Sequence, residues 1–250
     1  MQWDLPTVMN RKGKQLMSSK APIFLAIDTA DLDVAKAWVR ATQDYLTGYK
    51  LGLEFFAALG SAGVQEISAI TDADIFLDLK LHDIPNTVSG ATRQIALLKP
   101  RFLTVHACGG KAMIEAAVKE GPNIDIAAVT VLTSLGSDDL AEVGFKSSPL
   151  DTTVALAKLA KSAGAKAIIC SPLEIAAVRQ AVGPELSIIT PGVRPALEKI
   201  FDDQQRTMDP KTAMDSGATY LVIGRPITNA WALGSEALRE RAASIASQLS

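Results

Sequence analysis

The sequence has few cysteines, no long apolar run and no excess of one charge. Its two cysteines, Cys108 and Cys170, lie far apart without a Cys-x-x-Cys pair, so neither a disulfide framework nor a zinc motif is predicted. Free thiols suit a reducing compartment, and we expect a cytoplasmic protein. No apolar stretch reaches the roughly 18 residues of a membrane span, and the N-terminus has no apolar core of a signal peptide. We therefore expect no membrane partner.

The charges almost balance. Lys and Arg total 25 against 27 Asp and Glu, which gives a net charge of −2. A general nucleic-acid binder is normally strongly basic, so no nucleic-acid partner is expected. Hydrophobic residues make up 48% of the 250 residues, which is enough for a large buried core and argues against disorder. This length suits one or two domains, and single α/β barrels also reach it.

Short apolar, β-branched runs alternate with amphipathic stretches along the whole chain. Helical patterns cover residues 33–43, 86–98 and 152–163. The starts of the expected strands are spaced by roughly 28 residues, the length of one βα unit. The eight expected strands are Pro22–Asp28, Thr47–Gly52, Asp74–Lys80, Phe102–His106, Asp125–Leu132, Ala165–Cys170, Leu186–Thr190 and Thr219–Gly224.

Eight βα units predict a single-domain (β/α)8 TIM barrel over residues 22–250, with residues 1–21 as an extension packed on it. An open, doubly wound sheet is the alternative, but the first strand is followed by no Gly-x-Gly-x-x-Gly motif. The longest strand-free segments are Thr133–Leu150 and Pro191–Met208. Both follow strands, so a barrel would place them on its catalytic face, where long loops are often functional.

Charged residues occur at the ends of the first three predicted strands. Asp28 ends the first, Lys50 lies in the second, and Asp78 and Lys80 lie in the third, followed by Asp83. Side chains two residues apart on a strand share a face, so Asp78 and Lys80 point into the barrel while the intervening leucines pack on helices. Ion pairs that plug the barrel are the alternative. Because desolvation opposes the attraction in a buried pair, such a cluster favours function over stability.

A second group of residues is typical of a phosphate site. The seventh strand runs into a Pro-Gly-Val-Arg turn that ends at Arg194, and the eighth runs into Gly224 and Arg225. Barrels often bind phosphate on the loops after these strands, since glycine lets backbone amides approach an anion and arginine binds its oxygens. Two tight turns with surface arginines are the alternative.

Other catalytic motifs are missing. The two histidines, His82 and His106, have no partner at a metal-ligand spacing, so no metal is expected, and we interpret His106 as a hydrogen-bonded barrel residue. Neither a Gly-x-Ser-x-Gly nor a P-loop motif occurs.

The run DLKLHDIPNT at Asp78–Thr87 closely resembles the signature of the orotidine 5′-phosphate decarboxylase family. Further segments resemble that family in the same order: AID at 26–28, YKLG at 49–52, VTVLTS at 129–134, TPGVRP at 190–195, DDQQR at 202–206 and VIGRPIT at 222–228. Together they cover roughly residues 22–230. One departure is Asp202, which stands where a glycine is frequent in the family and makes Gln204 a better match than Gln205 for the phosphate contact.

The resemblance implies decarboxylation of orotidine 5′-monophosphate to UMP, the last step of de novo pyrimidine synthesis. It implies no cofactor, and a homodimer with shared active sites. The resemblance implies that Lys80 is the proton donor, that the Asp78 carboxylate lies beside the carboxylate of the substrate, and that Asp28 and Lys50 contact the ribose and the charged network. It implies that Asp83 and Thr87 reach into the partner's site and that Thr133 contacts the pyrimidine. The implied phosphate contacts are Arg194, Gln204, Gly224 and Arg225.

These residue types suit that chemistry. Loss of CO2 from C6 leaves a carbanion that no ring carbonyl delocalises, and the sequence has no motif for a cofactor that acts as an electron sink. A lysine can both stabilise the developing charge and supply a proton. A related Mg²⁺-dependent barrel acting on sugar phosphates shares the Asp-x-Lys-x-x-Asp spacing and remains the alternative enzyme. A catalytically inactive barrel that binds a phosphorylated ligand is the alternative of another class.

Overall fold

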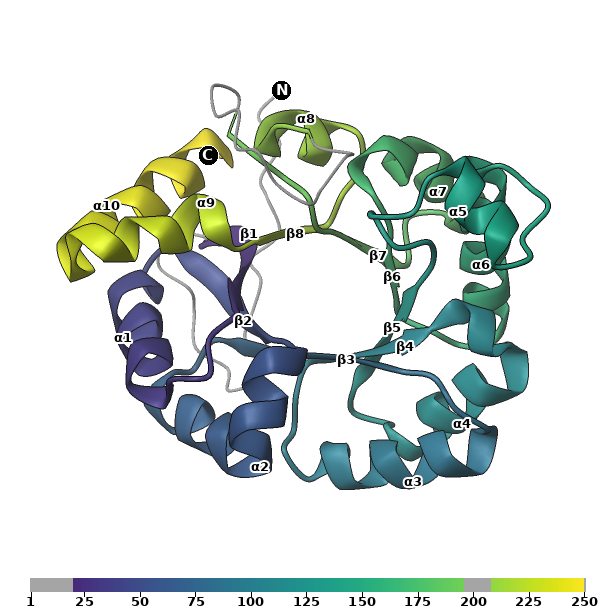
Figure 1. The fold of residues 1–250 in the computed structure, drawn as a ribbon, viewed down its shortest axis with the longest axis horizontal. Coiled ribbons are helices and arrows are strands. Elements are labelled where there is room, and N and C mark those ends of the chain that lie inside the picture. Colours follow the sequence, from purple (N-terminus) through teal and green to yellow (C-terminus); the bar gives the residue numbers. More distant parts are fainter. Residues whose placement is uncertain (1–19, 196–207, 250) are drawn as a thin grey trace, which may run out of the picture.

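The computed structural model describes residues 20–195 and 208–249. Eight parallel strands form one closed barrel in chain order, as the strand spacing predicts. Figure 1 shows the ring of strands surrounded by helices. The strands are β1 Ala21–Ile27, β2 Leu46–Leu51, β3 Asp74–Leu81, β4 Phe102–His106, β5 Asp125–Val129, β6 Ala167–Ile169, β7 Ser187–Thr190 and β8 Tyr220–Ile223.

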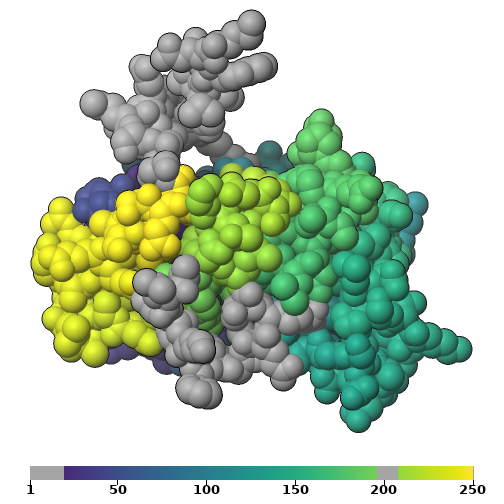
Figure 2. All heavy atoms as spheres, turned by 90° about the horizontal axis from the view of Figure 1, so that it is seen from above, coloured from purple at the N-terminus to yellow at the C-terminus, as the bar shows by residue number. Residues whose placement is uncertain are grey.

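Helices connect successive strands and cover the outside of the barrel. They are α1 Leu32–Thr42, α2 Leu53–Ile70, α3 Pro85–Ala96, α4 Lys111–Glu120, α5 Ser137–Glu142, α6 Pro149–Ser162, α7 Ile175–Val182, α8 Pro210–Asp215, α9 Arg225–Thr228 and α10 Ser235–Ala246. Figure 2 shows α10, in yellow, beside the yellow-green part of the chain that contains α8 and α9. Within the described ranges, no helix has both the length and the apolar character needed to cross a bilayer.

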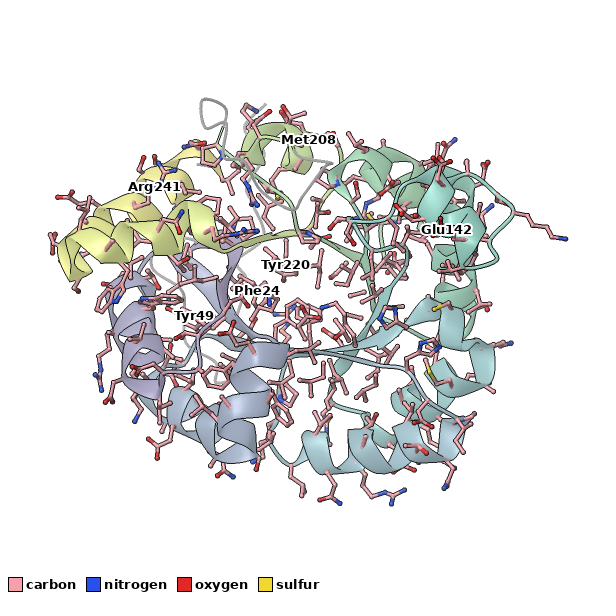
Figure 3. The ribbon with its side chains drawn as sticks, in the orientation of Figure 1. Phe24, Tyr49, Glu142, Met208, Tyr220 and Arg241 are labelled. Carbon is pink, nitrogen blue, oxygen red and sulfur yellow. The ribbon has the colours of Figure 1, made fainter. Side chains whose placement is uncertain are left out.

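The barrel has two apolar cores. Inside the ring, Phe24, Phe76 and Phe102 pack edge to face with ring centroids 5.6–5.7 Å apart, and Tyr220 joins them. The larger core lies between strands and helices, where the hydroxyl of Tyr49 donates to the carbonyl of Val39 on α1. Figure 3 shows Phe24 and Tyr220 toward the inside of the ring. The inner core fills the interior of the barrel below the carboxyl ends of the strands, so these ends stay open for a site.

The predicted elements differ from the observed ones mainly at their ends. Seven of the eight strands match the prediction within two residues at each end. The strand predicted over 125–132 is wrong beyond Val129, because the chain turns there and Val131 and Leu132 line a cavity instead. The segment predicted as the loop Thr133–Leu150 contains α5, where the Asp139 carboxylate accepts a hydrogen bond from the Gly136 amide.

The third helix predicted from the pattern begins earlier than expected. It starts at Pro149 rather than at residue 152, because the Ser148 hydroxyl accepts a hydrogen bond from the Asp151 amide and caps the first turn. The extension predicted over residues 1–21 lies outside the described residues as far as residue 19, and Ala21 already belongs to β1. Its packing on the barrel stays a prediction.

Candidate active site

A cavity of about 240 Å³ opens at the carboxyl ends of the strands. Eight of the residues predicted to form the site line it: Asp28, Lys50, Asp78, Lys80, Thr133, Arg194, Gly224 and Arg225. Apolar side chains from the inner core form its floor, among them Phe76 and Val222. The topology therefore unites residues that are spread over almost 200 positions of the sequence.

Four charges of alternating sign follow one another from the residue after β1 across β2 to β3. The Lys50 ammonium lies 3.4 Å from Oδ1 of Asp28 and 3.5 Å from Oδ2 of Asp78. The Lys80 ammonium lies 2.8 Å from Oδ1 of Asp78. Asp78 is thus held between two lysines, one at each carboxylate oxygen. We refer to Asp28, Lys50, Asp78 and Lys80 as the charge row.

The Asp78 carboxylate stays ionised in spite of its burial. Burial acts to raise its pKa, but the charges of Lys50 and Lys80 and hydrogen bonds from Lys80 and Thr104 outweigh that effect and hold the pKa below its usual value. Asp28, at the other end of the charge row, is exposed to solvent. Of its side chain 57% is exposed, against 13% of the Asp78 side chain. The charge row therefore has a solvated carboxylate at one end, and at the other a largely buried carboxylate paired with the partly exposed Lys80.

Sequence reasoning missed Thr104, which lies at the centre of β4. Its hydroxyl donates to Oδ1 of Asp78 at 3.0 Å and accepts from the backbone amide of Lys80 at 2.8 Å. A polar residue at an inward position of the apolar strand FLTVH was the available signal. Gly52 was also missed: a Cβ built there lies 3.0 Å from the Lys50 ammonium and 3.2 Å from Asp28, so a side chain would crowd the row.

The loops after β7 and β8 bring two arginines to the cavity. Arg194 follows β7, and its backbone amide donates to the carbonyl of Met208 at 2.9 Å, which ties together the two described ends of the predicted loop 191–208. Arg225 begins α9 directly after β8. A Cβ at Gly224 would lie 3.3 Å from that of Ala26, so glycine keeps this edge of the cavity open. Gln204, Gln205 and Asp202 lie outside the described residues.

Asp83 and Thr87 do not join the others. Both side chains are exposed, and neither is among the described residues that line the cavity of their own chain. The Asp83 carboxylate accepts a hydrogen bond from the Ile84 amide at 2.7 Å, just before α3. Their predicted reach into a partner's site requires a second copy of the chain and stays a prediction.

The protonation of two further residues near the site follows from their surroundings. Burial and the nearby Glu174 carboxylate raise the pKa of the Cys170 thiol to about 12, so this cavity residue is not a thiolate near neutral pH. The His106 ring lies 5.4 Å from that of His82 and, within the described residues, forms no side-chain hydrogen bond, contrary to expectation. Burial and the nearby His82 and Lys80 lower the His106 pKa, so the ring is neutral near pH 7.

Comparison with known proteins identifies the family of this chain. Residues 21–239 match the model of the Orotidine 5′-phosphate decarboxylase / HUMPS family. An orotidine 5′-phosphate decarboxylase of Thermobifida fusca is 49% identical over 210 residues, which cover 84% of this chain and 90% of that protein. Another, from Wolbachia pipientis, is 47% identical over 209 residues, which cover 83% and 91%.

A solved structure extends the likeness to three dimensions. The crystal structure of orotidine 5′-phosphate decarboxylase from Lactobacillus acidophilus matches this chain with a TM-score of 0.75 and 32% identity, covering 90% of this chain and 99% of that one. The family model spans most of the chain, and close relatives align over almost their full length. The chain therefore belongs to the orotidine 5′-phosphate decarboxylase / HUMPS family.

Proposed function

We propose that this chain decarboxylates orotidine 5′-monophosphate to UMP and CO2, the last step of de novo pyrimidine synthesis, with Lys80 as the proton donor. The observation that carries the proposal is the buried Asp78 carboxylate between two lysines, in a cavity that also holds Arg194 and Arg225. Relatives at 47–49% identity that bear the name orotidine 5′-phosphate decarboxylase support this choice of reaction.

The reaction breaks the bond between C6 and the carboxylate carbon. CO2 leaves without the bonding electrons, so the electron pair stays on C6 as a carbanion. A cation fixed beside C6 stabilises that pair, and the same ammonium then gives C6 a proton. Lys80 suits both tasks, since its ammonium is fixed 2.8 Å from Asp78 at the cavity wall. Solvent returns a proton to the Lys80 amine after product release.

Asp78 has two effects on this step. It holds the Lys80 ammonium in place, and its own charge faces the carboxylate of the bound substrate. Two like charges about 4 Å apart repel by about 4 kcal/mol at an effective dielectric constant of about 20. Lys50 and Lys80 offset much of that repulsion, because they lie at the two oxygens of Asp78. The repulsion that remains is relieved when CO2 leaves, while the attraction of Lys80 for C6 grows.

The rest of the cavity orients the nucleotide. Asp28, at the exposed end of the charge row, and Lys50 bind the ribose hydroxyls. Thr133 lies beside the pyrimidine, and Arg194, Gly224 and Arg225 bind the phosphate together with Gln204. Binding energy from a phosphate remote from C6 raises the chemical rate by orienting the base.

The active unit is a homodimer in which Asp83 and Thr87 complete the partner's site. The exposure of both side chains, away from the cavity of their own chain, supports this arrangement. We expect the enzyme to act in the cytoplasm, because its two free cysteines suit a reducing compartment.

One experiment tests the reaction directly. The purified protein is incubated with orotidine 5′-monophosphate, and the loss of substrate absorbance and the release of CO2 are followed with and without a chelator such as EDTA. We expect equal turnover in both conditions. Turnover abolished by the chelator and restored by Mg²⁺ would favour the sugar-phosphate alternative. Binding without turnover would favour the inactive barrel.

A further inference from the structure

Thr104 is a buried residue that no step of the proposed reaction uses. Its side chain is fully buried, and it points into the barrel, because Phe102 two residues earlier belongs to the inner core. Leu103 and Val105, on the other face of β4, pack in the outer core. Thr104 does not line the cavity, as far as the described residues define it, so it lies behind the charge row rather than at the substrate.

The pairing of β3 with β4 is irregular at this residue. Leu77 pairs with Leu103 and Leu81 pairs with Val105, so three residues of β3 lie opposite the single residue Thr104. Such a bulge leaves strand residues without a regular partner and redirects their side chains. Lys80 lies in this bulge with φ of 48°, a left-handed conformation that lysine rarely adopts.

The Thr104 hydroxyl links the two halves of the bulge. It accepts a hydrogen bond from the Lys80 amide at 2.8 Å, and it donates to Oδ1 of Asp78 at 3.0 Å. The same Oδ1 accepts from the Lys80 ammonium at 2.8 Å. Lys80 is therefore held at its backbone by the hydroxyl and at its ammonium by the carboxylate that this hydroxyl orients. A closed ring of three hydrogen bonds results.

We propose that Thr104 is a positioning residue for decarboxylation, which fixes the left-handed backbone of Lys80 and the orientation of Asp78. The inference rests on the proposed function, because it assigns Thr104 a role through the proton donor. The hydroxyl replaces the strand pairing that the bulge interrupts, and it does so from a different strand. It stabilises the placement of the ammonium toward C6 and has no contact with the nucleotide.

Four variants separate this role from simple packing. Thr104→Val keeps the volume and loses the hydroxyl, whereas Thr104→Ser keeps the hydroxyl and loses a methyl group. Thr104→Cys matches serine in shape but has only a weak donor. The control is Thr42→Val, which removes another buried hydroxyl, bonded to the Trp38 carbonyl on α1. Decarboxylation of orotidine 5′-monophosphate is measured for each, with thermal unfolding to confirm the fold.

We expect kcat of Thr104→Val to fall about ten- to a hundredfold, the effect of one hydrogen bond to a charged group, with KM changed less than threefold. Thr104→Ser keeps kcat within about threefold of wild type, and the Thr42 variant does the same. If packing were the whole role, valine would outperform serine. That order, or an unchanged kcat in Thr104→Val, would overturn the proposal. Should the valine variant not fold, equal rates for Thr104→Ser and Thr104→Cys would overturn it.

The pH profile gives a readout that packing does not move. Asp78 faces Lys50 from β2 and Lys80 from its own strand, with His106 of β4 and Asp28 after β1 nearby. Loss of the Thr104 hydroxyl removes a donor to the Asp78 carboxylate, so the acid limb of kcat/KM moves to higher pH in Thr104→Val and not in Thr104→Ser. The substrate titrates in the same way with every variant, so its own protonation does not contribute to the difference between the pH profiles. An inactive wild type refutes the proposed function, whereas an active wild type with identical variant profiles refutes only the positioning role.

Discussion

Removal of the Lys80 ammonium tests the mechanism most directly. In the proposed mechanism, Lys80→Ala deletes the group that both stabilises the C6 carbanion and protonates it. A positioned general acid contributes about 10²–10⁴-fold, and a preorganised charge contributes about 10²–10³-fold. We therefore expect kcat to fall by about 10⁴- to 10⁷-fold, which corresponds to about 5–10 kcal/mol of activation free energy.

The effect on stability is expected to be much smaller. Breaking a buried ion pair completely destabilises a protein by about 3–5 kcal/mol. Asp78 keeps Lys50 at 3.5 Å and the Thr104 hydroxyl at 3.0 Å, so we expect a loss of about 1–3 kcal/mol for Lys80→Ala. Urea unfolding measures this loss, and the substrate's absorbance measures turnover.

A second variant separates chemistry from folding. Lys80 has φ of 48°, and a left-handed backbone disfavours residues with a Cβ by about 1–2 kcal/mol. Lys80→Gly also lacks the ammonium but relieves that cost, so we expect it to be about 1 kcal/mol more stable than Lys80→Ala and equally inactive. The matched control is Lys36→Ala, which breaks the Lys36–Glu66 pair of 2.6 Å on the outer helices and keeps full turnover. If either folded Lys80 variant kept a tenth of wild-type kcat, Lys80 would not be the proton donor.

Three more predictions test the dimer, the phosphate site and the ionised carboxylate. Inactive Asp83→Ala and inactive Lys80→Ala proteins regain activity when mixed, because a mixed dimer has one site with both groups intact; no recovery after confirmed subunit exchange contradicts shared sites. Arg225→Ala lowers kcat/KM for the nucleotide by roughly tenfold to a few hundredfold, since a charge-assisted hydrogen bond to phosphate contributes about 1.5–3 kcal/mol. The same variant leaves kcat/KM for the phosphate-free nucleoside almost unchanged. Equal losses on both substrates would show that Arg225 supports the fold and does not bind the phosphate. Asp78→Asn destabilises the protein by an amount that is constant from pH 7 to about pH 5 and shrinks only below the ordinary carboxyl pKa of about 3.9. The reason is that the pKa of Asp78 is lowered in the folded state, so the stabilisation by its charge is lost as the pH falls through the folded-state pKa. Urea midpoints of the two proteins that already converge at pH 6 would show that the Asp78 carboxyl is protonated in the folded protein.

The local pattern of the sequence was sufficient to predict the barrel. Apolar runs at regular spacing imply βα units, and eight such units close into a ring in which β8 pairs with β1. The loops after β7 and β8 therefore lie at the same rim of the barrel as the carboxyl end of β1. The alternation of side chains along a strand is a local property, so it also placed Asp78 and Lys80 on one inner face. The rule that barrels bind phosphate on the loops after β7 and β8 also predicted that Arg194 and Arg225 line the cavity.

Only the tertiary structure determined how the charge row is held. Thr104 lies 26 positions from Asp78 and 24 from Lys80 in the chain, and no spacing along a single strand indicates a hydrogen bond between neighbouring strands. The register of β3 against β4 changes between Leu77 and Leu81, and this bulge gives Lys80 its left-handed backbone. Strand register depends on how all eight strands close into one ring, which is a non-local property. The sequence by itself therefore identified the four members of the charge row, and the packing of β4 against β3 decided the orientation of Asp78 and Lys80.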